Sequence, residues 1–247
     1  MTAEVLPVTS DGYALNAWVE RASEPRGLVY LLHGIPSVNL PEPDDTGYAG
    51  FARRFAERGW TTAWADLRGV RGTAGYFSIE GWVRDAIAVI SALRGAAPGV
   101  GFLALVGSSA GGAVSAEVIR RGTRADALAM LASPAAWLSF AADPRAGIEK
   151  ITTEAGMPIA TEVLGDPSAW ANEFDSIAGE VSIEGVTVPT LIVHGTADDV
   201  VPVSHASRIA ARAPHAELGI ISGAGHILRR DERAVARVLE WLDKVGP

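Results

Sequence analysis

The sequence contains no cysteine, which excludes disulfides, thiolate nucleophiles and cysteine-ligated zinc sites. It also has no apolar run close to the roughly 18 residues that a membrane span needs. Basic residues are outnumbered, with 21 Lys and Arg against 29 Asp and Glu, and the net charge is −8. This balance argues against nucleic acid or an anionic membrane as the main partner. Residues 1–5 show neither a basic region nor an apolar stretch, so we expect no secretory signal and a cytoplasmic protein.

The 247 residues have an ordinary globular composition, 48% hydrophobic and 20% charged. Short apolar runs bounded by turn residues predict strands, and amphipathic stretches between them predict helices. The predicted strands cover 4–10, 13–21, 27–32, 60–65, 100–106, 126–132, 190–193 and 216–221. The predicted helices cover 47–58, 79–94, 110–121, 204–212 and 229–244. This alternation predicts an α/β fold with a mostly parallel sheet of about eight strands, flanked by helices on both faces.

The alternation stops between Pro134 and Pro189. We therefore divide the chain into a core of residues 1–134 and 189–247 and an insertion of residues 135–188, with helical pieces over 146–155 and 168–178. Five large apolar residues of the insertion are candidates for substrate binding: Trp137, Phe140, Met157, Trp170 and Phe174. They could line an acyl or aryl pocket, or they could hold the insertion onto the sheet, and both interpretations stay open.

Active sites of such sheets lie at the carboxyl ends of the strands. There, a G-x-S-x-G pattern at residues 107–111 joins a buried strand to a helix. Such a turn needs small residues on both sides of the serine and exposes its hydroxyl at a helix N-terminus. Ser109 is therefore the candidate nucleophile, although an N-capping serine in a glycine-rich turn is the alternative.

A serine needs a general base and a buried carboxylate to act as a nucleophile. His226 lies in a tight loop between the last strand and the last helix, where an imidazole can reach the strand ends. Asp198 and Asp199, after the strand at 190–193, are the candidate acids, and only one of the two should point inward. The remaining histidines have simpler expected roles. We expect His33 and His194 to fix their loops through backbone hydrogen bonds, and His205 and His215 to be solvated.

Two N–H groups should stabilise the oxyanion of the reaction. Ala110 supplies one, since it follows the nucleophile, and Ile35 is the candidate for the other because Pro36 has no N–H. The acidic residues of the same loop, Glu42, Asp44 and Asp45, could attract a cationic substrate. The alternative is a solvated acidic loop.

With these residues in order, the chain resembles the α/β-hydrolase superfamily over nearly its whole length, especially its serine esterase-like and serine aminopeptidase-like members. The matching stretches are 33–36, 66–72, 107–111, 194–202 and 223–226. The resemblance implies a Ser109–Asp198–His226 triad, with Ile35 and Ala110 as oxyanion donors. It favours Asp198 over Asp199, because the family's acid stands three residues after the glycine of the His-Gly pair. It also implies that the insertion is a lid and that no cofactor is needed.

The function that follows is cleavage of a small or medium carboxylic ester through an acyl-enzyme intermediate. Amide, peptide or carbon–carbon bond hydrolysis by the same triad is the alternative, and a non-catalytic ligand-binding protein on this fold is a further one. We expect a small-molecule substrate, no metal, no nucleic-acid or membrane partner, and a monomer or homodimer.

Overall fold

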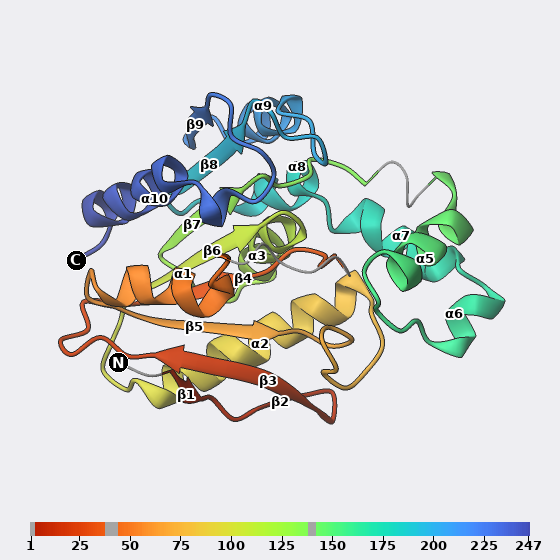
Figure 1. The fold of residues 1–247 in the computed structure, drawn as a ribbon, viewed down its shortest axis with the longest axis horizontal. Helices are drawn as coiled ribbons and strands as arrows, with labels where there is room; N and C mark the ends of the chain where they lie inside the picture. The colour runs from red at the N-terminus through yellow and green to blue at the C-terminus, as the bar shows by residue number, and fades with distance from the viewer. Residues whose placement is uncertain (1–2, 38–43, 138–141) are drawn as a thin grey trace.

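The computed structural model describes residues 3–37, 44–137 and 142–247. Over these residues the chain forms a nine-stranded sheet (Figure 1). The strands are β1 (Glu4–Val5), β2 (Val8–Ser10), β3 (Tyr13–Glu20), β4 (Gly27–Leu32), β5 (Trp60–Asp66), β6 (Leu103–Ser108), β7 (Ala127–Leu131), β8 (Thr190–Gly195) and β9 (Glu217–Ile221).

The strand order is β1-β3-β5-β4-β6-β7-β8-β9, with β2 paired to β3. All pairs from β5 to β9 are parallel, whereas β3 runs antiparallel to β5. The predicted, mostly parallel sheet is confirmed. The strand predicted over 4–10 is interrupted at residues 6–7, so it forms β1 and β2, which pair with opposite ends of β3 in one common register.

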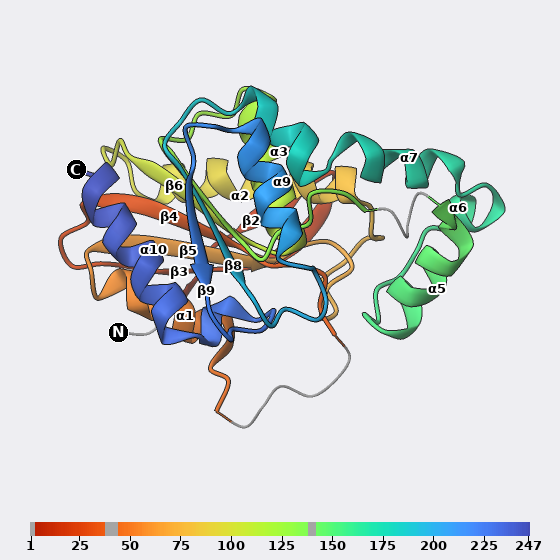
Figure 2. The same cartoon turned by 90° about the horizontal axis from the view of Figure 1, so that it is seen from above.

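Helices cover both faces of the sheet (Figure 2). On one face lie α2 (Ile79–Ala96), α3 (Ala110–Arg120) and α9 (Ser204–Arg212), and on the other lie α1 (Gly47–Ala56) and α10 (Glu232–Val245). The last helix begins three residues later than predicted, because residues 228–230 form a 3-10 turn and the Asp231 carboxylate caps the helix.

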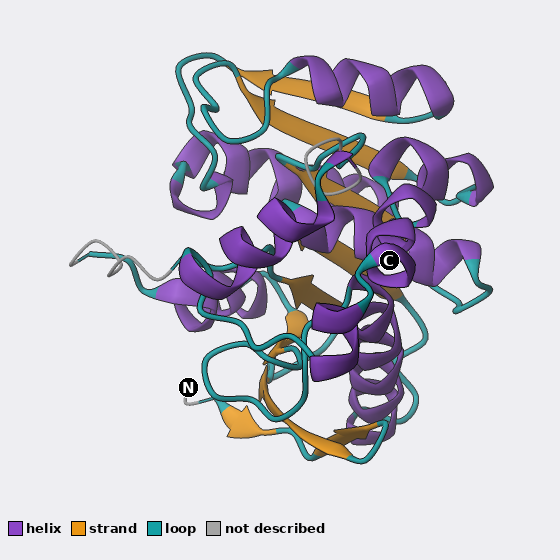
Figure 3. Cartoon of the chain, turned by 90° about the vertical axis from the view of Figure 1, so that its right-hand side faces the viewer, coloured by secondary structure: helices purple, strands orange, loops and turns teal. Residues whose placement is uncertain are grey.

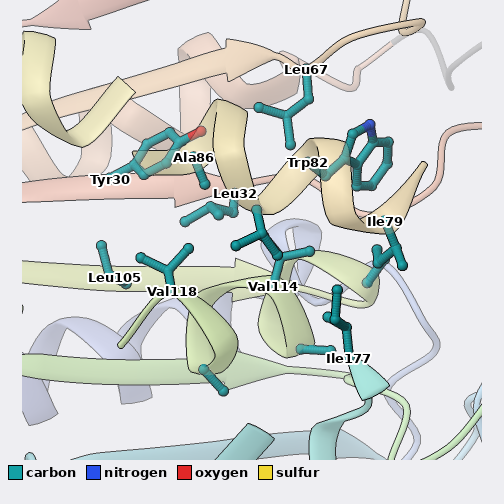
Figure 4. Packing of buried hydrophobic residues seen from close by; sticks show 14 of the residues in the cluster. Tyr30, Leu32, Leu67, Ile79, Trp82, Ala86, Leu105, Val114, Val118 and Ile177 are labelled. Atoms are coloured by element: carbon teal, nitrogen blue, oxygen red, sulfur yellow. The ribbon is translucent and has the colours of Figure 1, made fainter. Parts of the chain in front are cut away.

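Each face has its own hydrophobic core. Figure 4 shows the larger one, in which Leu32 of β4 packs with Trp82 of α2 and Val114 of α3. Burial of one such large side chain contributes roughly 1.5–3 kcal/mol, so this layer holds α2 and α3 against the sheet. The parallel register pairs Leu32 with Gly107, and Ser108 with Leu131. The carboxyl ends of β4, β6 and β7 therefore lie side by side.

Between β7 and β8 the described chain forms α5 (Pro144–Thr153), α6 (Thr161–Gly165), α7 (Ser168–Ser176), α8 (Gly179–Ser182) and the 3-10 turn η1 (Ile183–Gly185). The two predicted helical pieces are confirmed as α5 and α7, and the short elements were not predicted. The segment α5–α7 projects beyond the sheet in Figure 2 and faces the viewer in Figure 3. The two ends of the insertion meet. Gly179 N–H donates to the Pro134 carbonyl and Glu180 N–H donates to the Ala135 carbonyl, both at 3.1 Å.

Candidate active site

The turn between β6 and α3 holds Ser109 in a strained backbone conformation, with φ +51° and ψ −123°. Its N–H donates to the Leu131 carbonyl at 2.7 Å, which ties the turn to the end of β7. The side chain is partly exposed at the N-terminus of α3. The hydroxyl therefore lies at the carboxyl end of the central strand β6, as the G-x-S-x-G pattern predicts.

The glycines around this turn allow unusually close packing. A Cβ on Gly111 would lie 2.5 Å from the Leu32 carbonyl oxygen, and one on Gly107 would overlap the backbone of Gly111. A Cβ on Gly34 would lie 2.6 Å from Ser109 Cβ. The loop after β4 therefore passes directly beside the serine, which only residues without a side chain permit.

His33 fixes the shape of this loop. Its Nε2 accepts the Leu67 N–H at 3.1 Å, so the ring proton is on Nδ1, which donates to the Gly34 carbonyl at 2.7 Å. Burial lowers the pKa of His33, which favours this neutral ring. In a trans peptide the C=O and the next N–H point in opposite directions. The Ile35 N–H therefore points away from His33, and within the described residues neither it nor the Ala110 N–H donates a hydrogen bond.

Asp198 and His226 meet across 28 residues of sequence. His226 Nδ1 donates to Asp198 Oδ2 at 2.8 Å, and the other carboxylate oxygen accepts the N–H groups of Val200 and Val201 at 3.0 and 2.8 Å. The Asp198 side chain is fully buried, whereas Asp199 is exposed. The structure thus directs Asp198, rather than Asp199, toward the histidine.

An ion pair that was not predicted from the sequence joins the loop before α1 to the turn that follows His226. Arg229 forms a bidentate ion pair with Asp45, in which Nη2 lies 2.6 Å from Oδ2, and its guanidinium lies 5.6 Å from the centre of the Tyr48 ring. Arg229 also lowers the pKa of Asp45. The available signal was the complementary charge of two pairs of neighbours, residues 44–45 and 229–230.

This ion pair corrects the solvated-loop alternative for Asp45 alone, because Asp44 is exposed as that alternative expects. The Asp45 side chain is buried and paired with Arg229, and Asp44 pairs with Arg230 at 2.8 Å. Glu42 lies outside the described residues. Asp45 is therefore paired in the interior, whereas Asp44 keeps an exposed carboxylate beside Arg230.

The other histidines divide into three cases. His194 bonds to the Val201 carbonyl at 2.8 Å and so contacts backbone, as expected, and His215 is exposed. The solvated state expected for His205 is wrong. Its Nδ1 accepts the Ala135 N–H at 2.9 Å, and burial lowers its pKa, because α9 packs against the start of the insertion.

Four of the five apolar candidates of the insertion are buried against each other: Trp137, Met157, Trp170 and Phe174. The Phe174 ring lies 4.7 Å from that of Trp170 and 5.4 Å from that of Trp137, and Phe77 of the core completes the cluster. Trp137 also donates to the Ile177 carbonyl at 2.7 Å. These contacts hold the insertion together and onto the core. Phe140 lies outside the described residues.

The residues that the structure describes contain no group of three or more His, Asp or Glu side chains placed to hold a metal ion. Among the described helices, none combines the length and the apolar character needed to cross a bilayer.

Comparison with solved structures supports the same fold. Est1E from Butyrivibrio proteoclasticus, with ferulic acid bound, has 19% identity and a TM-score of 0.73, over 97% of this chain and 98% of its own. An esterase from Pyrococcus furiosus has 17% identity and a TM-score of 0.71, over 100% and 92%. A thermophilic esterase from Thermogutta terrifontis, with malate bound, has 18% identity and a TM-score of 0.69, with both chains fully covered.

No curated protein matches the chain in sequence. The family model described as serine aminopeptidase, S33, does match, over residues 23–161, which is more than half of the chain. The chain therefore belongs to the S33 serine aminopeptidase family and is a serine hydrolase of the α/β-hydrolase superfamily.

Proposed function

We propose that this hydrolase cleaves a small or medium carboxylic ester, with Ser109 as nucleophile, His226 as general base and Asp198 as the acid that orients it. The observation that carries the proposal is the partly buried Asp198–His226 hydrogen bond of 2.8 Å, at the carboxyl ends of the strands, where Ser109 occupies a strained turn. Since Nδ1 of His226 donates to the carboxylate, Nε2 is the basic nitrogen of the neutral ring. No hydrogen bond joins Nε2 to Ser109 within the described residues, and such bonds often form only when substrate binds.

In the first half of the reaction, Ser109 Oγ attacks the ester carbonyl while His226 Nε2 takes the hydroxyl proton. The tetrahedral oxyanion accepts hydrogen bonds from the N–H groups of Ile35 and Ala110, neither of which has another acceptor in the described chain. His226 then protonates the departing alkoxide, and the acyl group remains on Ser109. Asp198 stabilises the imidazolium throughout.

In the second half, water replaces the alcohol. His226 takes a proton from the water as it attacks the acyl-enzyme, and the same two N–H groups hold the new oxyanion. Collapse of this intermediate releases the carboxylic acid and returns the proton to Ser109. The chain's own groups complete this cycle, so the proposed reaction has no cofactor.

The family description favours a second candidate, hydrolysis of an aminoacyl amide or peptide. An aminopeptidase must bind the substrate's ammonium group, for which a free carboxylate is the natural partner. Asp44 and Asp45 are occupied by Arg230 and Arg229, and Asp66, at the end of β5, pairs with Arg71 at 2.7 Å. We therefore rank the ester first, in keeping with the three structural relatives that are named or described as esterases or bind an aromatic acid.

The deciding experiment is labelling with a fluorophosphonate probe, followed by mass spectrometry of the modified peptide. We expect stoichiometric labelling on Ser109, none in Ser109→Ala, and a loss of turnover on the order of a million-fold in that folded variant. Parallel assays use an ester chain-length series, aminoacyl amides and diketones.

Each outcome decides between named alternatives. Preferred turnover of esters supports the proposal, and preferred turnover of aminoacyl amides or of diketones replaces the ester by that bond. Tight binding of one compound without turnover or labelling supports a ligand-binding protein on this fold. An active, folded Ser109→Ala variant overturns the triad.

A further inference from the structure

A second histidine lies against the carboxylate of Asp198. His194 is the penultimate residue of β8, four residues before the aspartate, and its side chain is fully buried. Its Nε2 bonds to the Val201 carbonyl at 2.8 Å and lies 3.1 Å from Asp198 Oδ2. The same carboxylate oxygen accepts the hydrogen bond from His226. Two imidazole rings therefore approach a single oxygen.

The contacts determine where the His194 proton is. A carbonyl and a carboxylate are both acceptors, so an unprotonated Nε2 would place its lone pair against two oxygens. Nε2 therefore carries a proton. Nδ1 has no hydrogen-bond partner within the described residues, although it is buried. A neutral ring with its proton on Nε2 satisfies these conditions, because an imidazolium would also bury an unpaired N–H.

Histidine is an unfavourable choice for a core position of a parallel strand. One ring nitrogen stays without a partner, a penalty that leucine or valine would avoid. The hydrogen bond from His194 to Val201 offsets this penalty. The N–H of Val201 donates to Asp198 Oδ1 and its C=O accepts from His194, so one residue links the ring to the carboxylate.

We propose that His194 is a positioning residue for the reaction, which acts by holding the Asp198 carboxylate in the orientation that receives His226. This inference rests on the proposed function of the triad. The Nε2–H clamps the loop of residues 195–201 back onto β8 and places a positive hydrogen beside Oδ2. Without it, Val201 is released from β8, its N–H holds the carboxylate less firmly, and the imidazolium of His226 is stabilised less well.

The test compares His194→Leu, which removes the donor, with His194→Gln, whose amide N–H reaches a similar distance. We expect kcat/KM for the preferred ester to fall roughly 10- to 100-fold in the leucine variant, by analogy with the hydrogen-bond partners of metal-ligating histidines and carboxylates. The glutamine variant keeps most of the activity. The acid limb of the pH profile, which reports His226, moves to lower pH in the leucine variant only.

A double-mutant cycle identifies the residue through which His194 acts. In an Asp198→Asn background, His194→Leu should cost little further activity, because the carboxylate that it positions is already absent. An equal fold-loss in both backgrounds, or an unshifted acid limb in an active leucine variant, overturns the inference alone. If the folded wild-type chain is neither labelled on Ser109 nor active, the proposed function fails and the inference fails with it.

Discussion

The Nδ1 atom of His33 lies 2.7 Å from the carbonyl oxygen of Gly34, the next residue in the chain. This short contact turns the peptide plane that carries the Ile35 N–H, and the Leu67 N–H holds the other side of the ring. A buried side chain of the core thus sets the direction of a backbone donor beside Ser109. The direction of that donor depends on a ring that is itself buried in the core.

His33→Phe should lower kcat by about 100-fold or more, which is the effect of losing one oxyanion donor in a characterised protease. The phenyl ring fills the same space beside Trp82 but cannot orient the Gly34 carbonyl. KM for the ester should change little, because the donor acts in the transition state. Steady-state kinetics test this, with the exposed His215→Phe as control. An unchanged kcat in a folded His33→Phe protein would contradict it.

The neighbouring aspartates should respond very differently to the same substitution. Asp198→Asn should reduce kcat by roughly 10⁴-fold. The amide oxygen would accept the N–H groups of Val200 and Val201, so the NH2 group would face His226 and favour the wrong ring tautomer. Asp199→Asn, at an exposed position, should leave kcat within about twofold, since surface changes away from the site are usually small. Kinetics of both variants at neutral pH decide the matter, and the reverse order of effects would move the acid to Asp199.

The Asp45–Arg229 pair should stabilise the fold far more than its neighbour. Arg229→Met leaves the buried Asp45 carboxylate unpaired and should lower the free energy of unfolding by roughly 3 kcal/mol. Arg230→Met removes an exposed pair and should lower it by less than about 1 kcal/mol. Urea titrations measure the free energy of unfolding of both variants. Similar decreases in the two would argue against a stabilising Asp45–Arg229 ion pair.

The same pair predicts a pH dependence. Because Arg229 holds the pKa of Asp45 below its ordinary value of 3.8, the stabilisation is complete above that value. It is lost as pH falls through the lowered pKa. Urea titrations from pH 7 to 2 should therefore show wild type and Arg229→Met converging in acid, and a constant difference would contradict the assignment.

Glu173 of α7 should show the opposite pH dependence. Burial raises the pKa of this carboxyl, which accepts the Glu80 N–H at 3.0 Å at the start of α2. Its folded-state pKa lies above the ordinary value, so stability is lost as pH rises through it. Glu173→Gln keeps the acceptor and removes the charge. Its Tm should exceed that of wild type at pH 8, with the gain vanishing below about pH 4.5, the ordinary value for a glutamate. A gain that is independent of pH would refute this explanation.

Local pattern explains why much of the fold and the site was predictable. The turn at Ser109 needs small residues at fixed spacings, and the loops that carry Asp198 and His226 follow strands whose apolar runs are plain in the sequence. The interruption at residues 6–7 was not predicted, because β1 and β2 keep one register with β3 and so follow a single strand pattern in the sequence.

Other features depend on contacts between distant segments. Asp45 and Arg229 are separated by 184 residues, and composition alone left Asp45 in a solvated loop. His205 was assigned to the surface because it flanks a helix expected at the surface, whereas the insertion that packs on its ring has no regular pattern. Such partners are fixed by tertiary packing, which sequence periodicity does not encode.

The paired ends of the insertion have an evolutionary consequence. Residues 136–178 leave and return through two adjacent backbone hydrogen bonds, from Gly179 to Pro134 and from Glu180 to Ala135. The crossover to β8 is completed by α8, where Ser182 bonds to the buried Glu117 of α3 at 2.9 Å. The entropy of closing a loop changes only by about 0.6 kcal/mol for each doubling of its length. In descendants of this chain, a longer or shorter segment can therefore replace residues 136–178 while every strand pairing of the sheet is retained.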